Sequence, residues 1–254
     1  MLKSSLVCVF LLLCLVTPVV SAEMLDGAQE LAQSGFVDES YDDLYDDLYA
    51  DDEAAEIYDP LEGLNRGTFW FNDKCYFYLV KPLARGFRVV PTPVRKGLAK
   101  MFDNLNSPIR AINCLLQGQF CQFGKETTRL VVNSTLGVVG FFDAADHFWQ
   151  IKKKDEDFGQ TLGYYGVGEG FYVVIPLLGA SNIRDGLALV PDSYADPIPW
   201  LVDSKIALAL TAGKVVNRVS LDKDTYESIV AEQLDPYLFT RDAYVQNRRA
   251  KVID

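Results

Sequence analysis

The chain has 254 residues, a formal net charge of −11 and a single histidine. The acidic balance argues against nucleic acid as a partner, because phosphate binding needs clustered lysine and arginine. One histidine also excludes a multi-histidine metal site. We therefore expect neither a nucleic-acid-binding protein nor a protein that depends on a metal or another cofactor.

Residues 1–22 have the pattern of a secretory signal peptide. Lys3 supplies the positive charge, residues 6–16 form an apolar run, and the segment ends in small residues at Ala22. The apolar run is shorter than the roughly 20 residues that a membrane-spanning helix needs. We expect an exported chain, cleaved near Ala22, although a retained signal could also act as an anchor.

The five cysteines divide between the signal and the rest of the chain. Cys8 and Cys14 follow Val and Leu rather than a small residue, which predicts that neither is lipidated. The other three are Cys75, Cys114 and Cys121, an odd number for an oxidising compartment. Cys114 and Cys121 would lie about 10 Å apart on one helix, too far for a disulfide. Cys75 could pair with either, or all three could remain free thiols.

Residues 23–58 form an acidic segment. Between Glu23 and Asp59 there are fourteen acidic residues and no basic one, whereas residues 60–254 hold 21 acidic and 23 basic residues. A Tyr-Asp-Asp-Leu repeat runs from Tyr41 to Tyr49. Such composition favours a disordered, solvated tether. It also fits a docking segment for a basic surface, because Tyr and Leu four residues apart would share one face of a helix.

Residues 59–254 form the predicted folded domain, and helices dominate it. Helical periodicity predicts helices over residues 108–120, 122–139 and 204–219, and a strand over 171–175. A helix after Pro93 would carry Val94, Leu98, Met101 and Leu105 on one face and Arg95, Lys96 and Lys100 on the other. The broad apolar faces fit either a soluble core or helices lying in the plane of a membrane.

Two patterns could suggest chemistry, and both have simpler explanations. His147 lies near Asp143 and Asp146, but the chain has no G-x-S-x-G elbow or other signature of an activated nucleophile. The glycines from Gly166 to Gly170 precede a strand rather than a helix, which argues against a dinucleotide-binding loop. We expect no enzyme activity.

A series of short motifs runs through the whole folded domain. They are DPLEGLNR from Asp59, then Phe69, Phe71 and Asn72, KPL from Lys81, VPTPVR from Val90, LLQG from Leu115, NSTLG from Asn133, EDFGQTLG from Glu156 and DPY from Asp235. In these motifs and their order, the domain resembles the MlaA/VacJ family of bacterial outer-membrane phospholipid-transport proteins.

The resemblance implies an all-α fold in which amphipathic helices lie in the membrane plane and form a ring, with a short Gly-rich hairpin or loop. It implies a protein on the periplasmic side of the outer membrane that removes mislocalised phospholipids from the outer leaflet through an amphipathic channel. The implied partners are phospholipids, an outer-membrane porin trimer and a periplasmic lipid carrier of the same pathway. The alternative is a soluble periplasmic lipid-binding or porin-adaptor protein.

We expect the Gly-rich stretch between residues 159 and 179 to shape the channel, because irregular backbone at membrane depth must be buried or line a cavity. Residues on the first helix are a second set that could line or gate it, although all of these residues could instead pack the ring. The candidates are Gly159, Gly163, Gly166, Gly168, Gly170 and Pro176, together with Phe69, Phe71 and Asn72.

Overall fold

The computed structural model describes residues 57–222 and 224–253. The predicted signal peptide and nearly all of the acidic segment therefore lie outside the described residues. Helices make up most of the described part, in the order α4 (Glu62–Cys75), η1 (a π-helix, Tyr76–Val80), α5 (Lys81–Phe87), α6 (Thr92–Leu105), α7 (Ser107–Leu116), α8 (Phe120–Thr135), α9 (Ala144–Trp149), α10 (Phe158–Tyr164), β1 (Tyr172–Ile175), β2 (Gly179–Asn182), α11 (Ile183–Ala195), α12 (Ile198–Leu201), α13 (Ser204–Leu221), α14 (Thr225–Glu232) and α15 (Pro236–Ile253).

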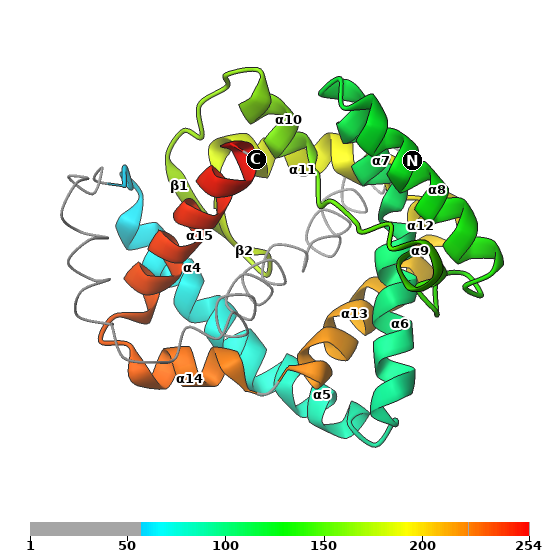
Figure 1. Cartoon of the computed structure of the whole chain (residues 1–254). Coiled ribbons are helices and arrows are strands. Elements are labelled where there is room, and N and C mark those ends of the chain that lie inside the picture. Colours follow the sequence, from blue (N-terminus) through cyan, green and yellow to red (C-terminus); the bar gives the residue numbers. More distant parts are fainter. Residues whose placement is uncertain (1–56, 223, 254) are drawn as a thin grey trace, which may run out of the picture.

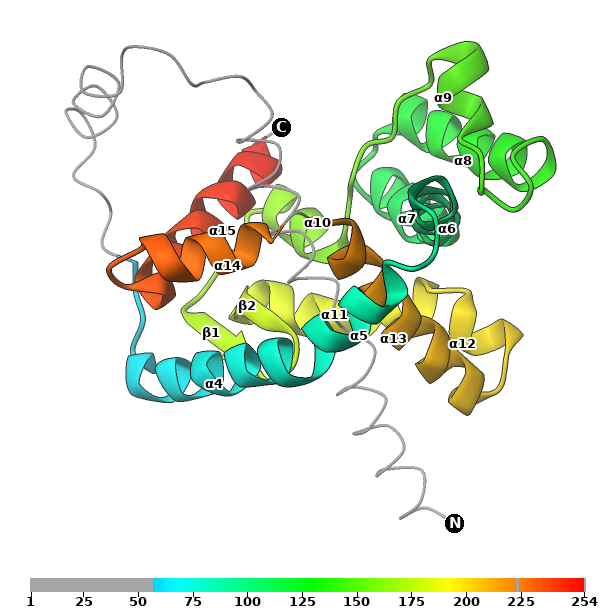
Figure 2. The same ribbon diagram turned by 90° about the horizontal axis from the view of Figure 1, so that it is seen from below.

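The elements follow one another around a ring (Figure 1). α4 and α5 form one side, α6 to α9 turn through the next, and α10 and α11 lead back towards α15 and α14 beside α4. Seen from below, α4, α5, α11, α12 and α13 form one layer, with α14 and α15 above it at one end and α6 to α9 at the other (Figure 2). The predicted all-α, ring-like fold with a short hairpin is confirmed.

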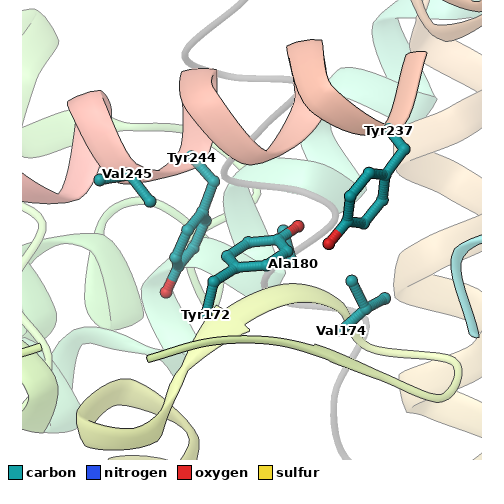
Figure 3. Close-up of a cluster of buried hydrophobic side chains, with 6 residues drawn as sticks. All are labelled: Tyr172, Val174, Ala180, Tyr237, Tyr244 and Val245. Atoms are coloured by element: carbon teal, nitrogen blue, oxygen red, sulfur yellow. The ribbon is translucent and has the colours of Figure 1, made fainter. Parts of the chain in front are cut away.

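The hairpin joins the two halves of the ring. β1 and β2 are antiparallel, with Tyr172 opposite Asn182 and Ile175 opposite Gly179. The sequence predicted β1 but not β2, whose residues Gly-Ala-Ser-Asn lack the apolar alternation of a strand. α15 covers the hairpin with an aromatic cluster (Figure 3) that contains Tyr172, Val174, Ala180, Tyr237, Tyr244 and Val245.

The interior of the described part is unusually polar. Its buried polar and charged residues outnumber its buried apolar ones, and many large apolar side chains are exposed. Arg110 illustrates the pattern: it lies on α7, is buried, and donates to Glu126 of α8 over 2.9 Å. A ring one or two helices thick encloses little apolar volume, so hydrogen-bonded charges hold neighbouring elements together.

One predicted helix face is wrong in part. Arg95 was placed on the polar face of α6, but it is buried and donates to the carbonyl oxygens of Val90, over 2.9 Å, and of Ser220 on α13. Val94, on the predicted apolar face, is 39% exposed. α6 packs on α13 through its arginine, and the guanidinium provides the donors that cap the end of α13.

Two predicted helices are shorter than expected because glycines end or follow them. The helix predicted to reach residue 120 ends at Leu116, where Gly118 adopts a φ of +74°. The helix predicted to reach residue 139 ends at Thr135, and Val138 and Val139 beyond it have positive φ. The first break separates buried Cys114 from exposed Cys121, and neither these cysteines nor Cys75 forms a disulfide.

Candidate functional site

Two asparagines attach the hairpin to α4. Asn65 donates to the Tyr172 carbonyl over 3.1 Å and accepts from the Val174 amide over 2.8 Å. Two turns further along the same helix, Asn72 donates to the Ile175 carbonyl over 3.0 Å and accepts from the Leu177 amide over 2.7 Å. The two side chains are seven residues apart, so they lie two turns apart on the same face of the helix. Their side chains supply the hydrogen bonds that a neighbouring strand would otherwise provide on this side of β1.

The two attachments differ in their exposure to water. Asn65 is 2% exposed, and its side-chain nitrogen also donates to Asp59 over 2.7 Å. Asn72 is half-buried, and its partner Leu177 lies in the exposed turn between the strands with a φ of +65°. A turn held at one end by a solvent-accessible amide is the part of this contact that can open at low cost.

The structure places the two phenylalanines predicted near this site in different environments. Phe69 packs against the aromatic cluster, with its ring 5.8 Å from that of Tyr237 in an edge-to-face arrangement. Phe71 is 45% exposed. The third candidate on α4, Asn72, hydrogen-bonds to the hairpin turn, where Pro176 is exposed. Asn65 was not among the predicted candidates, although it belongs to the DPLEGLNR motif. Its seven-residue spacing from Asn72 is the signal that could have identified it.

The candidate glycines fall into two groups. A Cβ atom on Gly159 would clash with the Asp185 carboxylate, and one on Gly163 would lie 2.8 Å from Val252 and 2.9 Å from Arg184. These two glycines let α10 approach α11 and α15. The others lie in the loop before β1: Gly166 and Gly170 have positive φ, and a Cβ on Gly168 would meet nothing within 4 Å.

A buried charge network fixes α10, α11 and α15 next to the hairpin. Arg248 donates to both carboxylate oxygens of Asp157, over 2.6 and 2.9 Å, and to Asp185 over 2.8 Å. Tyr244 and Asn182 also donate to Asp185, over 2.8 and 2.7 Å. Burial alone would raise the pKa of each carboxyl, but the charge and hydrogen bonds of Arg248 outweigh it and hold both pKa values below their usual range.

Asp192 is the exception among these buried carboxyls. It accepts from the Phe158 amide over 3.0 Å and from Asn113 over 3.1 Å, but no basic side chain pairs with it among the described residues. Burial, with the nearby charge of Asp157, raises its pKa to about 7. The sequence analysis did not single out Asp192, because only the folded chain places it beside the start of α10.

The described residues contain no group of three or more side chains arranged to hold a metal ion. His147 is exposed on α9 and its ring contacts Phe148. No described helix combines the length and apolar composition needed to cross a membrane.

Known proteins share both this sequence and this fold. The chain is 36% identical over 193 residues to the intermembrane phospholipid transport system lipoprotein MlaA of Escherichia coli, covering 74% of this chain and 76% of the relative. It is 32% identical over 206 residues to the protein of that name in Haemophilus influenzae, covering 80% and 82%. A solved structure, described as a structural basis for maintenance of bacterial outer membrane lipid asymmetry, matches with a TM-score of 0.66 and 30% identity over 76% of this chain and 98% of that one.

The prediction that the chain is not lipidated is wrong, because both of these relatives are named lipoproteins. That prediction rested on the bulk of one side chain, Leu13 or Val7, before each early cysteine. Both cysteines lie outside the described residues.

The family comparison covers nearly all of the described part. The model of the family described as MlaA lipoprotein matches residues 57–251, from just before α4 into the last turn of α15. The hairpin, both asparagines and the Arg248 network all lie within that range. The chain belongs to the MlaA lipoprotein family.

Proposed function

We propose that this chain transports phospholipid between the outer and inner membranes and thereby maintains the lipid asymmetry of the outer membrane. Phospholipids misplaced in the outer leaflet would pass through an amphipathic channel within the ring to a periplasmic carrier, next to a porin trimer. The names of the relatives support the transport role. The observation that supports the channel is the ring-like arrangement of the elements (Figure 1) together with the many exposed apolar side chains.

The exposed apolar side chains suit helices that lie in a lipid leaflet. α11 exposes Leu187 and Tyr194, and α12 exposes Trp200 and Leu201, all by two-thirds or more of their surface. Burial of apolar area contributes about 25 cal/mol per Å², so a lipid environment stabilises this surface and water does not. Trp and Tyr favour the boundary between lipid and water, where the ring can be apolar and its polar atom hydrated.

A phospholipid that leaves a bilayer must keep its acyl chains from water, because each exposed methylene costs about 0.8 kcal/mol. Its headgroup needs a polar path at the same time. A ring of amphipathic helices can supply both environments within the width of one helix. No covalent step is required, and we assign the chain no catalytic residue.

The hairpin is the element that we propose regulates passage. Its turn, with Pro176 and Leu177, is held to the ring by Asn72, and breaking two hydrogen bonds at a partly exposed site releases it. The glycines at positions 166, 168 and 170 give the loop before β1 the backbone freedom to follow the turn. Gly159 and Gly163 keep α10 packed, so that movement is confined to the loop and hairpin.

The function can be tested in the bacterium that makes this chain. Deleting the gene should increase the phosphatidylethanolamine that a membrane-impermeant amine reagent labels on intact cells, and the wild-type gene on a plasmid should reverse it. Asn72→Ala should alter the labelling relative to wild type at equal protein level. Thr68→Ala should not, because the half-buried Thr68 hydroxyl donates to the Leu64 carbonyl within the same helix and not to the hairpin. Unchanged labelling after deletion would refute the transport role, and recovery of the mature chain as a soluble lipid-binding protein would favour the adaptor alternative.

A further inference from the structure

A strongly basic corner forms where α5 meets α6. Residues 81–105 contain six basic residues and one acidic residue, although the folded part as a whole is nearly neutral. Three of these basic residues already have partners: Lys81 is paired with Glu227, Arg88 with Asp224, and Arg95 is buried against α13. The other three, Arg85, Lys96 and Lys100, are exposed, and within the described ranges they have no hydrogen-bond or ion-pair partner.

The corner also exposes apolar side chains between these charges. Leu83 is 61% exposed and Val89 is 86% exposed. Lys96 and Lys100 are four residues apart and therefore lie on one face of α6. Three cations next to apolar side chains match a partner that combines carboxylates with Tyr and Leu.

The acidic segment of this chain has that composition. Asp and Glu supply every charge between residues 23 and 59, and the repeat from Tyr41 to Tyr49 alternates paired aspartates with Tyr and Leu. We propose that this segment docks on the α5–α6 corner of its own chain, with its aspartates beside Arg85, Lys96 and Lys100 and its Tyr and Leu side chains over Leu83 and Val89.

The length of the chain permits this contact. The described part begins at Ile57, next to the start of α4. The distance along α4, η1 and α5, residues 62–87, is about 39 Å at 1.5 Å per residue. Asp43 precedes Ile57 by fourteen residues, which span up to about 46 Å when extended. The first half of the repeat therefore reaches the corner.

Basic side chains nearer to Ile57 are poorer targets because carboxylates already neutralise them. Arg66 is paired with Glu62 and Asp235, and Arg249 with Glu169. Breaking one of those ion pairs to form a new one would give no net gain in electrostatic free energy. The tether also favours a partner on the same chain, since a short flexible linker gives an effective concentration of about a millimolar.

The test is cross-linking of the full mature chain in non-ionic detergent with a carbodiimide, which joins a carboxylate to an amine in direct contact. We expect cross-links from Lys96 and Lys100 to acidic residues between 38 and 43, the ones that the chain length allows to reach them. A mixture of ¹⁴N- and ¹⁵N-labelled protein should give cross-links within one isotope only. At 1 M salt, where the screening length falls to about 3 Å, the yield should fall about tenfold.

Matched variants separate the corner from other exposed charges. Arg85→Gln, Lys96→Gln and Lys100→Gln together should leave the helical circular dichroism unchanged and abolish contact. Since the triple variant removes the reacting amines, contact is read here by fluorescence transfer between dyes at Ser40 and Gly86, each replaced by cysteine in a background without Cys75 and Cys121. Replacing Asp42, Asp43, Asp46 and Asp47 with Asn should have the same effect. Lys125→Gln with Lys152→Gln, exposed changes on the α8 side, should leave both readouts as in wild type.

Three results would overturn the proposal. Cross-links that mix the two isotopes would make a second copy the partner. Cross-links spread equally over Lys125 and Lys152 would show that the segment has no preferred surface. Absence of contact, together with binding of the wild-type chain but not the triple variant to phosphatidylglycerol vesicles, would make an anionic lipid surface the occupant. These measurements do not involve lipid transport, so they can fail while the proposed function holds.

Discussion

The two asparagines of α4 make the same kind of contact with the hairpin, yet their loss should have different consequences. Asn65→Ala leaves the Tyr172 carbonyl and the Val174 amide without their side-chain partner next to a buried helix face. An unsatisfied buried polar group costs about 1–3 kcal/mol, so this change should destabilise the whole fold by about 2–5 kcal/mol. Asn72→Ala frees Ile175 and Leu177, which water can reach at the turn, and should cost only about 1 kcal/mol.

Urea unfolding in non-ionic detergent and amide hydrogen exchange measure the two effects separately. Asn72→Ala should raise exchange at the Leu177 amide about fivefold or more, consistent with loss of one hydrogen bond, and leave Val174 protected. Asn72→Asp should keep that amide bonded, because a carboxylate accepts it, while losing the donor to Ile175. Thr68→Ala is the control and should change neither readout, because the half-buried Thr68 hydroxyl donates to the Leu64 carbonyl of the same helix.

Equal losses of global stability for the Asn65 and Asn72 variants would refute this reasoning, because they would mean that the turn cannot open independently. Unchanged exchange at Leu177 in Asn72→Ala would refute it as well. In that case the turn would be held by its own strand pairing and not by α4.

Three further changes test the buried network. The pKa of Asp192 is raised, so the contribution of Asp192 to folding is lost as pH rises through about 7. Replacing it with Asn should therefore increase the free energy of unfolding more at pH 8 than at pH 5, by about 1–2 kcal/mol. Urea titration at the two pH values measures the difference. Arg248→Lys cannot reproduce the forked contact with Asp157 and should cost about 2–4 kcal/mol by thermal unfolding, whereas Arg249→Lys should cost under about 0.5. Gly163→Ala should lower stability by about 1–3 kcal/mol through its clash, and Gly124→Ala, with open space around it, should not.

Much of the secondary structure follows from local sequence. Prolines at the first turns of α6 and α7 and the apolar spacing after them predict where these helices begin. β1 is predicted by its run Tyr-Val-Val-Ile. β2 could not be predicted, because its four small or polar residues are strand only through pairing with β1.

The candidate site was predicted in its parts but not in its arrangement. Asn72 and the turn near Pro176 were both singled out, about a hundred residues apart in the chain, and the fold brings them into contact. Phe69 and Phe71 are two residues apart and looked equivalent, yet one packs in the aromatic cluster and the other faces outward. Positions two residues apart on a helix point about 200° apart, so only the location of α15 decides which of them is covered.

The sequence by itself determined the class of fold, the positions of most helices and the family resemblance, because these depend on local periodicity and on motifs in order. Tertiary structure alone decided which face of each helix is buried and which charges pair. An apolar stripe looks the same whether protein or lipid covers it, and Asp157 and Arg248 give no sign in sequence that they meet. Closing a ring brings together residues that are distant along the chain. The packing and charge interactions between them depend on the tertiary arrangement, which no local pattern encodes.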